Sequence, residues 1–300
     1  MSNLGALCDL ADLAVVRSEE ALSHESREHL ASVARRARRR RGFLGEVLVV
    51  AFAGGTGTGK SSLINEIVGE PVAAVGIARP TTTEALAVIP GATMAGFDGL
   101  LDELGVGRRV ESDLLDSLML VDLPDFDSTQ EANRRIVEDV LPRVDAVVWV
   151  ADPEKYADAV IHVDFLSAWS QYEGQFIFVL NQVDRLEGEA DRVVAHFADL
   201  LTRDGFTTPE VVQTIARGPD KDISPLRSAL ADRLDTKRTV TAKLATDLKI
   251  AAQNTWIEAG SSARSGIDDA ALRDRISLAA ATFVSLGVAA ADLLHQMAEE

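Results

Sequence analysis

The segment that most restricts the fold is the glycine-rich stretch at residues 54–61, which reads Gly-Gly-Thr-Gly-Thr-Gly-Lys-Ser. It follows an apolar run at 47–53 and precedes a helix-like stretch at 62–68. A strand, a loop of the form G-x-x-x-x-G-K-[ST] and a helix, in this order, predict a phosphate-binding P-loop. The glycines let successive backbone N–H groups face phosphate oxygens, and the helix N-terminus adds partial positive charge.

The residues of this loop have separate expected roles. Lys60 is expected to reach the β- and γ-phosphates of a nucleotide and to act in catalysis, and the Ser61 hydroxyl to bind Mg²⁺. The residues expected to surround the phosphates are Gly54, Gly55, Thr56, Gly57, Thr58, Gly59, Lys60, Ser61 and Ser62.

Composition and charge restrict the class of protein. A 300-residue chain with 47% hydrophobic and 26% charged residues can bury a core. A net charge of −17 disfavours general binding to nucleic acid phosphates. The single cysteine, Cys8, excludes an intramolecular disulfide and fits a reducing compartment. Residues 1–12 lack the pattern of a signal peptide, so we expect a cytoplasmic protein.

The chain has three expected parts. Between residues 43 and 237, apolar runs alternate with amphipathic stretches, which is typical of an α/β domain with a mainly parallel sheet flanked by helices. Residues 1–42 and 238–300 show helical patterns alone, and we expect a break in the second segment at Gly260–Ser262. We expect these two segments to pack together. The expected strands are 47–53, 84–90, 117–122, 144–151, 175–181 and 211–216, with a short helix at 97–104.

A threonine-rich stretch, Arg79-Pro80-Thr81-Thr82-Thr83, lies between the P-loop helix and the second expected strand. In a GTP-binding protein, the first switch places a threonine on Mg²⁺ and the γ-phosphate at this point. We favour Thr83 for this role, with Thr82 second. The alternative is that these threonines only begin a β-strand.

An acidic motif, Asp122-Leu123-Pro124-Asp125, ends the expected strand at 117–122. Asp122 is placed to bind Mg²⁺ through water. The usual pattern is Asp-x-x-Gly, in which the glycine N–H meets the γ-phosphate. Here Asp125 replaces the glycine, and its carboxylate would be repelled by the phosphate unless Mg²⁺ or water screens it.

A third motif, Asn181-Gln182-Val183-Asp184, ends the expected strand at 175–181. It resembles the guanine-specificity motif Asn-Lys-x-Asp. The Asp184 carboxylate can accept from guanine N1–H and the exocyclic amine, whereas adenine offers neither donor at these positions. Ala216 and Arg217 follow the last expected strand, where a second base-contacting loop would lie.

This ordered set of motifs resembles the GTPases of the translation-factor-related class, which have a Ras-like P-loop GTPase fold. The amino-acid sequence of five stretches is similar to that of dynamin-like GTPases of actinobacteria. These stretches are 48–65, 79–84, 120–128, 145–158 and 179–186. The resemblance implies Mg²⁺-dependent hydrolysis of GTP to GDP, coupled to self-association, or to association with a paralogous GTPase, at a membrane.

The residue that orients the attacking water is not evident from the motifs. Many small GTPases have a glutamine where this chain has Phe126, so Asp125, Asp127, Thr56 and a cis arginine finger at Arg79 are the candidates. In the resembling family, the place of Gly57 belongs to a residue that holds a monovalent cation. Two other hypotheses stay open: a nucleotide-binding switch or scaffold with little hydrolysis, and an ATPase, against which Asn181 and Asp184 argue.

The basic run at residues 35–41 contains six arginines in an otherwise acidic chain. Cations at a helix C-terminus complement the helix dipole, and this is the interpretation that we favour. The alternative is a patch for anionic lipid at the cytoplasmic face of a membrane.

Overall fold

The computed structural model describes residues 11, 15, 23–39, 47–73, 85–91, 97–124 and 140–263. The chain divides into two compact units. One is Val47–Asp235, and the other combines Met1–Glu46 with Thr236–Glu300.

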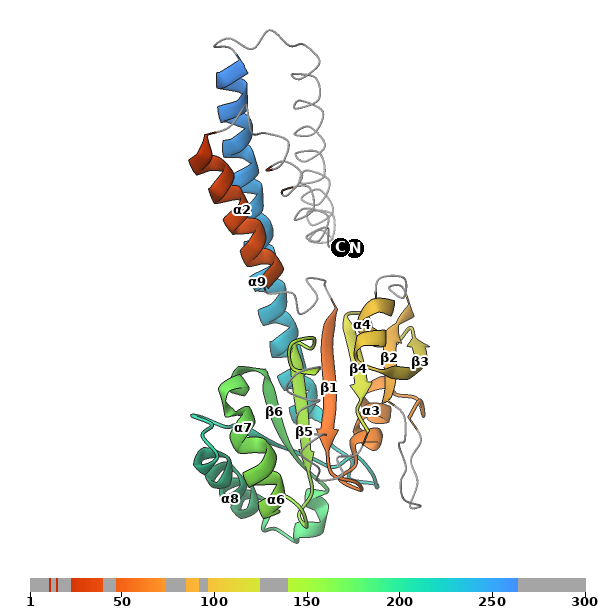
Figure 1. Ribbon diagram of the computed structural model, residues 1–300. Coiled ribbons are helices and arrows are strands. Elements are labelled where there is room, and N and C mark those ends of the chain that lie inside the picture. The colour runs from red at the N-terminus through yellow and green to blue at the C-terminus, as the bar shows by residue number, and fades with distance from the viewer. Residues whose placement is uncertain are drawn as a thin grey trace. The chain divides into compact units, whose positions relative to one another are not determined.

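The unit Val47–Asp235 is built on a seven-stranded sheet with the strand order β3-β2-β4-β1-β5-β6-β7 (Figure 1). β2 and β4 are antiparallel, and all the other neighbouring pairs are parallel. This confirms the expected fold class, a mainly parallel sheet flanked by helices as in P-loop GTPases. The strands are β1 (Leu48–Gly54), β2 (Ala85–Pro90), β3 (Val106–Ser112), β4 (Leu118–Asp122), β5 (Ala146–Ala151), β6 (Phe176–Asn181) and β7 (Val211–Thr214).

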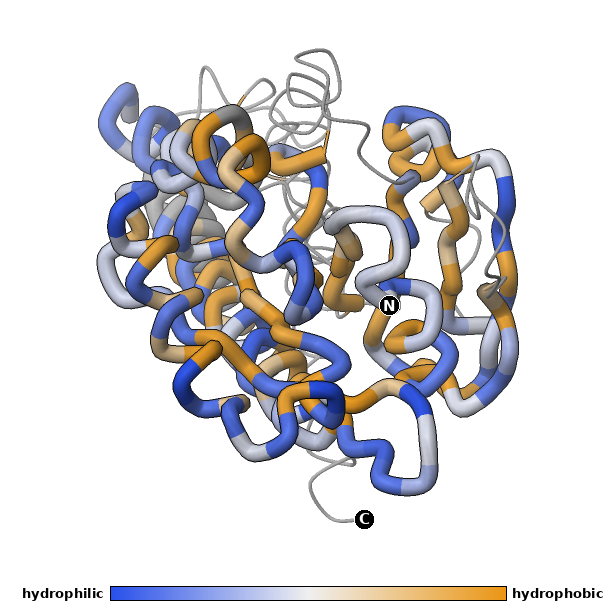
Figure 2. The backbone as a smooth tube through the Cα atoms, turned by 90° about the horizontal axis from the view of Figure 1, so that it is seen from below, coloured by the Kyte–Doolittle hydropathy of each residue, from blue (hydrophilic) through white to orange (hydrophobic). Residues whose placement is uncertain are grey.

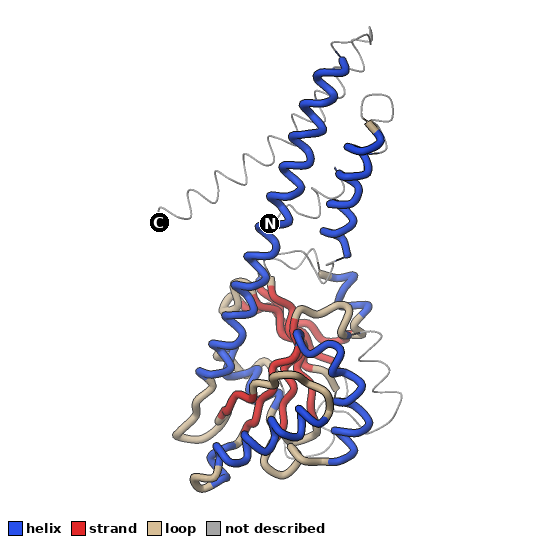
Figure 3. Tube along the Cα trace, turned by 90° about the vertical axis from the view of Figure 1, so that its left-hand side faces the viewer, coloured by secondary structure: helices blue, strands red, loops and turns tan. Residues whose placement is uncertain are grey.

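Helices cover the sheet on both sides, as the blue helices around the red strands in Figure 3 show. The π-helical turn η3 and the 3₁₀ turns η4 and η5 lie among the connections on the β5 to β7 side of the sheet. The helical elements of this unit are α3 (Lys60–Val68), α4 (Asp98–Glu103), α6 (Ala159–Ile161), η3 (His162–Leu166), α7 (Ser167–Trp169), η4 (Ser170–Gln175), η5 (Val183–Leu186), α8 (Ala190–Arg203) and the first part of α9 (Ser224–Ala263).

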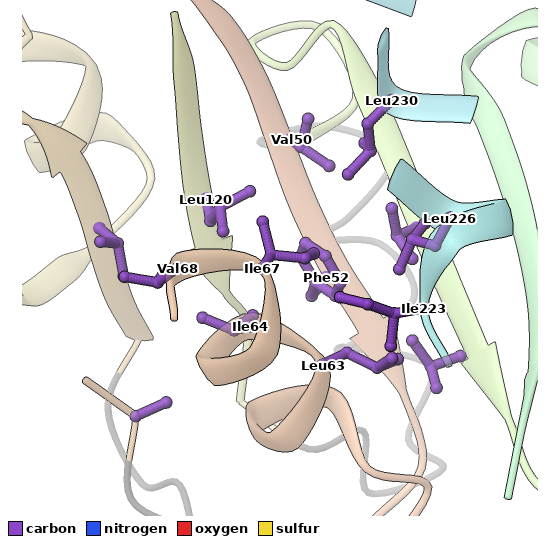
Figure 4. Close-up of a cluster of buried hydrophobic side chains, with 14 of the residues drawn as sticks. Val50, Phe52, Leu63, Ile64, Ile67, Val68, Leu120, Ile223, Leu226 and Leu230 are labelled. Carbon is purple, nitrogen blue, oxygen red and sulfur yellow. The ribbon is translucent and has the colours of Figure 1, made fainter. Parts of the chain in front are cut away.

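One face of the sheet packs against α3 and the start of α9. Val50 and Phe52 of β1 and Leu120 of β4 point to this face, since alternate strand residues face the same side (Figure 4). The helix residues packed against them include Leu63, Ile64, Ile67, Leu226 and Leu230. This packing fixes the first turn of α3, and with it the P-loop, against the end of β1.

The opposite face of β5 and β6 is aromatic. The ring centroids of Trp149 and Trp169 are 5.5 Å apart, and those of Phe178 and Phe206 are 4.9 Å apart. Both faces of these central strands are therefore buried, which explains why they read as continuous apolar runs. Figure 2 shows how hydrophobic and hydrophilic residues alternate along the backbone.

The other unit contains α2 (His24–Arg39) and the C-terminal part of α9. The Ser23 hydroxyl accepts from Ser26 N at 3.2 Å and caps the start of α2. Leu30, Val33 and Ala34 of α2 share a buried cluster with Leu248 and Ala251 of α9.

The break expected at Gly260–Ser262 was wrong, because α9 continues to Ala263. A glycine inside a helix costs only about 1 kcal/mol relative to alanine, which a long helix tolerates. Among the helices that the structure describes, none is long and apolar enough to cross a membrane.

Candidate functional site

The P-loop connects the end of β1 to the start of α3 in a conformation that requires glycine. Gly54 has φ +144° and Gly59, which precedes Lys60, has φ +98°. A Cβ atom at Gly54 would lie 2.2 Å from the Val150 carbonyl oxygen, and one at Gly59 would lie 2.2 Å from Asn181 Nδ2. Both positions therefore exclude any side chain.

Lys60 and Ser61 lie at the first turn of α3, next to the end of β4. The Lys60 ammonium is buried and donates to the carbonyl oxygens of Gly54, at 2.9 Å, and Gly55, at 3.2 Å. The Ser61 hydroxyl donates to Asp122 Oδ2 at 2.9 Å. Serine and aspartate oxygens are ligands that suit Mg²⁺, which is commonly held by one or two protein groups plus substrate phosphates. These two expected metal ligands are thus in contact with each other.

Asn181 at the end of β6 connects three loops. Its side chain is buried, and Nδ2 donates to the Thr58 carbonyl oxygen at 2.8 Å. Its Oδ1 accepts from the Thr214 hydroxyl at 3.1 Å and from Ala216 N at 3.3 Å. One amide thereby joins the P-loop, the motif at 181–184 and the loop after β7.

The rest of the expected base-contacting residues lie around the same point. Gln182 has the left-handed φ of +63°, uncommon for a residue other than glycine, and its Nε2 donates to the Gly57 carbonyl oxygen at 2.9 Å. Asp184 is exposed in η5. Arg217 Nε donates to the Ser62 hydroxyl at 3.0 Å, on the first turn of α3.

Three of the expected catalytic or metal-binding residues, Arg79, Thr83 and Asp125, lie outside the described residues. Thr82, Phe126 and Asp127 lie outside them as well. Their expected roles stay predictions.

A further loop at the site was assigned no role from the sequence motifs. It follows β5, where the buried Asp152 accepts at Oδ1 from the backbone N–H groups of Glu154 and Lys155, each at 2.9 Å. The Lys155 ammonium donates to the Thr56 carbonyl oxygen of the P-loop, and Glu154 pairs with Arg185. The only available signal was that these residues belong to the stretch 145–158, which carried part of the family resemblance.

Residues 49–182 match the family model described as 50S ribosome-binding GTPase. The matched segment includes the P-loop, Asp122 and Asn181. This stretch is thus similar in sequence to a GTPase family, and the unit that contains it has the fold of P-loop GTPases. No curated protein sequence matches the chain.

Solved structures resemble the chain at low sequence identity. A chain of an oligomerised bacterial dynamin pair is 12% identical, with 85% of this chain and 55% of that chain covered and a TM-score of 0.50. A second match from a bacterial dynamin pair covers 51% of that chain, with a TM-score of 0.48, so this chain spans about half the length of those dynamins. A probable GTP-binding protein engB is 16% identical, covering 63% of this chain and 99% of that chain, with a TM-score of 0.38. At these identities the likeness concerns the fold alone.

Proposed function

We propose that this chain binds GTP with Mg²⁺ and hydrolyses it slowly to GDP and phosphate. The observation that carries the proposal is the position of Asn181, which hydrogen-bonds to the P-loop at Thr58 and to the loop after β7 at Ala216. The loop that would read the base and the loop that would hold the phosphates therefore belong to one hydrogen-bonded frame. A nucleotide that spans both would be bound in a fixed orientation.

In this assignment the residues have distinct roles. Lys60 would bind the β- and γ-phosphates, and Ser61 and Asp122 would hold Mg²⁺, which would supply positive charge beside the phosphate oxygens. Asp184 accepts from the guanine ring. Thr83 of the first switch would bind the metal and the γ-phosphate, and Arg79 would neutralise charge during hydrolysis.

We further propose that the protein is a dynamin-like GTPase whose turnover is coupled to self-association or to a paralogous GTPase at a membrane surface. The support is the sequence resemblance and the likeness of fold to a chain of an oligomerised bacterial dynamin pair described as sensing and tethering membranes. In this proposal residues 43–237 are the GTPase domain, and the segments 1–42 and 238–300 form its helical appendage at the cytoplasmic face.

An alternative is a nucleotide-dependent switch or scaffold with little hydrolysis. It is favoured by Phe126, which stands where many GTPases have a water-orienting glutamine and has no polar group for that task. Calorimetry with GTP, GDP and ATP, followed by phosphate-release measurements, separates these functions. Equal affinity for GTP and ATP would refute guanine specificity, and GTP binding without turnover would favour the switch.

A further inference from the structure

Lys155 covers the outer side of the P-loop. Its ammonium donates to the Thr56 carbonyl oxygen, although the two residues are 99 positions apart in the sequence. Cβ atoms placed on Gly55 and Gly57 would lie 3.8 and 4.0 Å from Lys155 Nζ. Three neighbouring loop residues therefore locate the ammonium beside the segment whose N–H groups are expected to bind phosphate.

The backbone around Lys155 is fixed by its own contacts. Besides accepting from two N–H groups, Asp152 accepts from Tyr156 N at its carbonyl oxygen, at 3.0 Å. The Tyr156 carbonyl oxygen in turn accepts from His162 Nε2 at 2.7 Å, and His162 Nδ1 lies 2.5 Å from Asp204 Oδ2. The turn that carries Lys155 is thus bonded to Asp152, directly after β5, and is linked through His162 to Asp204, directly after α8.

Within the described part of the chain, Lys155 forms no ion pair. Among the residues that the structure describes, no carboxylate lies within ion-pair distance of its ammonium. The nearby Glu154 pairs with Arg185, and Asp152 is occupied by backbone N–H groups. Lys155 is thus a half-buried cation that donates to a neutral carbonyl oxygen of the P-loop. A cation in this position favours the binding of a phosphate oxygen beside it.

We propose that Lys155 is a second lysine of the nucleotide site, which donates to the terminal phosphate of a bound nucleoside triphosphate. This rests on the proposed function. An ammonium has three donors, so Lys155 can keep its bond to Thr56 while it binds a phosphate oxygen. It differs from Lys60, which lies inside the loop, because it approaches from the β5 side and belongs to a different element.

The role in hydrolysis follows from where charge develops. The water oxygen forms a bond to the γ-phosphorus while the bond from that phosphorus to the β–γ bridging oxygen breaks. The electron pair of the broken bond stays on GDP, and the proton of the water ends on the released phosphate. A fixed ammonium beside these oxygens stabilises the charge without reorganisation.

The test compares two substitutions that separate charge from hydrogen bonding. Lys155→Gln keeps an N–H donor for the Thr56 carbonyl but removes the charge, whereas Lys155→Arg keeps the charge. We expect Lys155→Gln to lose GTP affinity about tenfold or more relative to its GDP affinity, and Lys155→Arg to retain most of it. Lys221→Gln, which removes an exposed lysine paired with Glu66, is the control and should change neither affinity. Equal weakening of GTP and GDP binding in Lys155→Gln, or no change, would overturn the proposal in favour of a loop brace.

A second measurement uses the unaltered chain and does not depend on how the variants fold. Acetylation of lysines by a small reagent, followed by mass spectrometry, should show Lys155 protected by a non-hydrolysable GTP analogue with Mg²⁺ but not by GDP, with Lys221 as the internal reference. Protection that is the same in both states would refute the contact with the terminal phosphate. If the chain bound neither GTP nor GDP, the proposed function itself would fail, and this result is distinct from binding without selective protection.

Discussion

At the residue scale, the proposed base selectivity rests on Asp184, which is exposed in η5 two residues after Gln182, whose φ is positive. Asp184→Asn exchanges one acceptor for a donor, so we expect GTP affinity to fall about 10- to 100-fold and xanthosine triphosphate to bind better than GTP. Competition binding with both nucleotides measures this. Asp199→Asn, at an exposed carboxylate on α8, is the matched control. An unchanged preference for guanine would remove Asp184 from the site.

Lys60 offers a second test at the same scale. Its ammonium donates to the Gly54 and Gly55 carbonyl oxygens, and both are local contacts within the loop. We expect Lys60→Ala to lower GTP affinity at least about 100-fold, because charge-assisted bonds to two phosphates are lost. Filter binding and phosphate release provide the readout. Turnover at the parent rate would contradict the P-loop assignment.

The residues at the site could be predicted where a motif follows directly on a strand. Lys60, Asp122 and Asn181 each follow or end an apolar run, so their position at the carboxyl edge of the sheet follows from the sequence. The hydrogen bond between Lys155 and Thr56 could not be predicted from a sequence motif in this way. That contact depends on β5 lying beside β1, with Val150 opposite Gly54, which is a property of strand order and not of any local pattern.

At the scale of elements, two glycines test the contact between the P-loop and the loop that begins at Asn181. Gly59 and Gly69 both have positive φ and flank α3, but a Cβ at Gly59 meets Asn181 at 2.2 Å while one at Gly69 meets only Leu114, at 3.8 Å. We expect Gly59→Ala to abolish measurable nucleotide binding and Gly69→Ala to retain it, with a cost of about 1 kcal/mol in stability. Thermal unfolding and GTP titration of both variants decide this. Similar nucleotide affinity in the two variants would show that the Asn181 bond does not hold the loop.

Six of the seven strands of the sheet were predicted from the sequence, and one was missed. The six expected strands coincide with β1, β2, β4, β5, β6 and β7, most of which are buried over their whole length. β3 was not expected, because it lies at the sheet edge and only two of its seven residues, Val106 and Val110, have apolar side chains. There Arg109 pairs with Asp98 and Asp102 of α4, and a strand of this kind has no apolar run to reveal it.

Turnover is a property of the whole molecule. Because Phe126 cannot orient water, we expect basal hydrolysis well below about 10 per second, the median of enzymes. If association of two chains completes the site, the rate per chain should rise with protein concentration. The test is to measure phosphate release over a 100-fold dilution series of the protein. The molecular mass of the protein in solution is measured at the same concentrations to follow its association. A fast rate that does not depend on concentration would contradict both the slow basal step and its completion by a partner.

The helical unit provides the last test, since α9 is one helix that contributes residues both to the sheet-containing unit and to the helical unit. Leu226 and Leu230 pack against β1, and Leu248 packs against α2. Replacing the exposed residues Arg35 and Ile250 by cysteine, with Cys8 changed to serine, allows a pair of spin labels to report on the pairing of α2 with α9.

We expect a narrow distance distribution between these labels, because Leu30 and Val33 of α2 share one buried cluster with Leu248 of α9. We also expect a shift in this distribution between GDP and a non-hydrolysable GTP analogue, since α9 begins directly after the loop that contains Ala216 and Arg217. A broad distribution in every state would refute the packing. A narrow distribution that nucleotide leaves unchanged would refute only the coupling, and the helical unit would then act as a static brace or as a surface for association, because a signal carried along α9 must alter its contacts with α2.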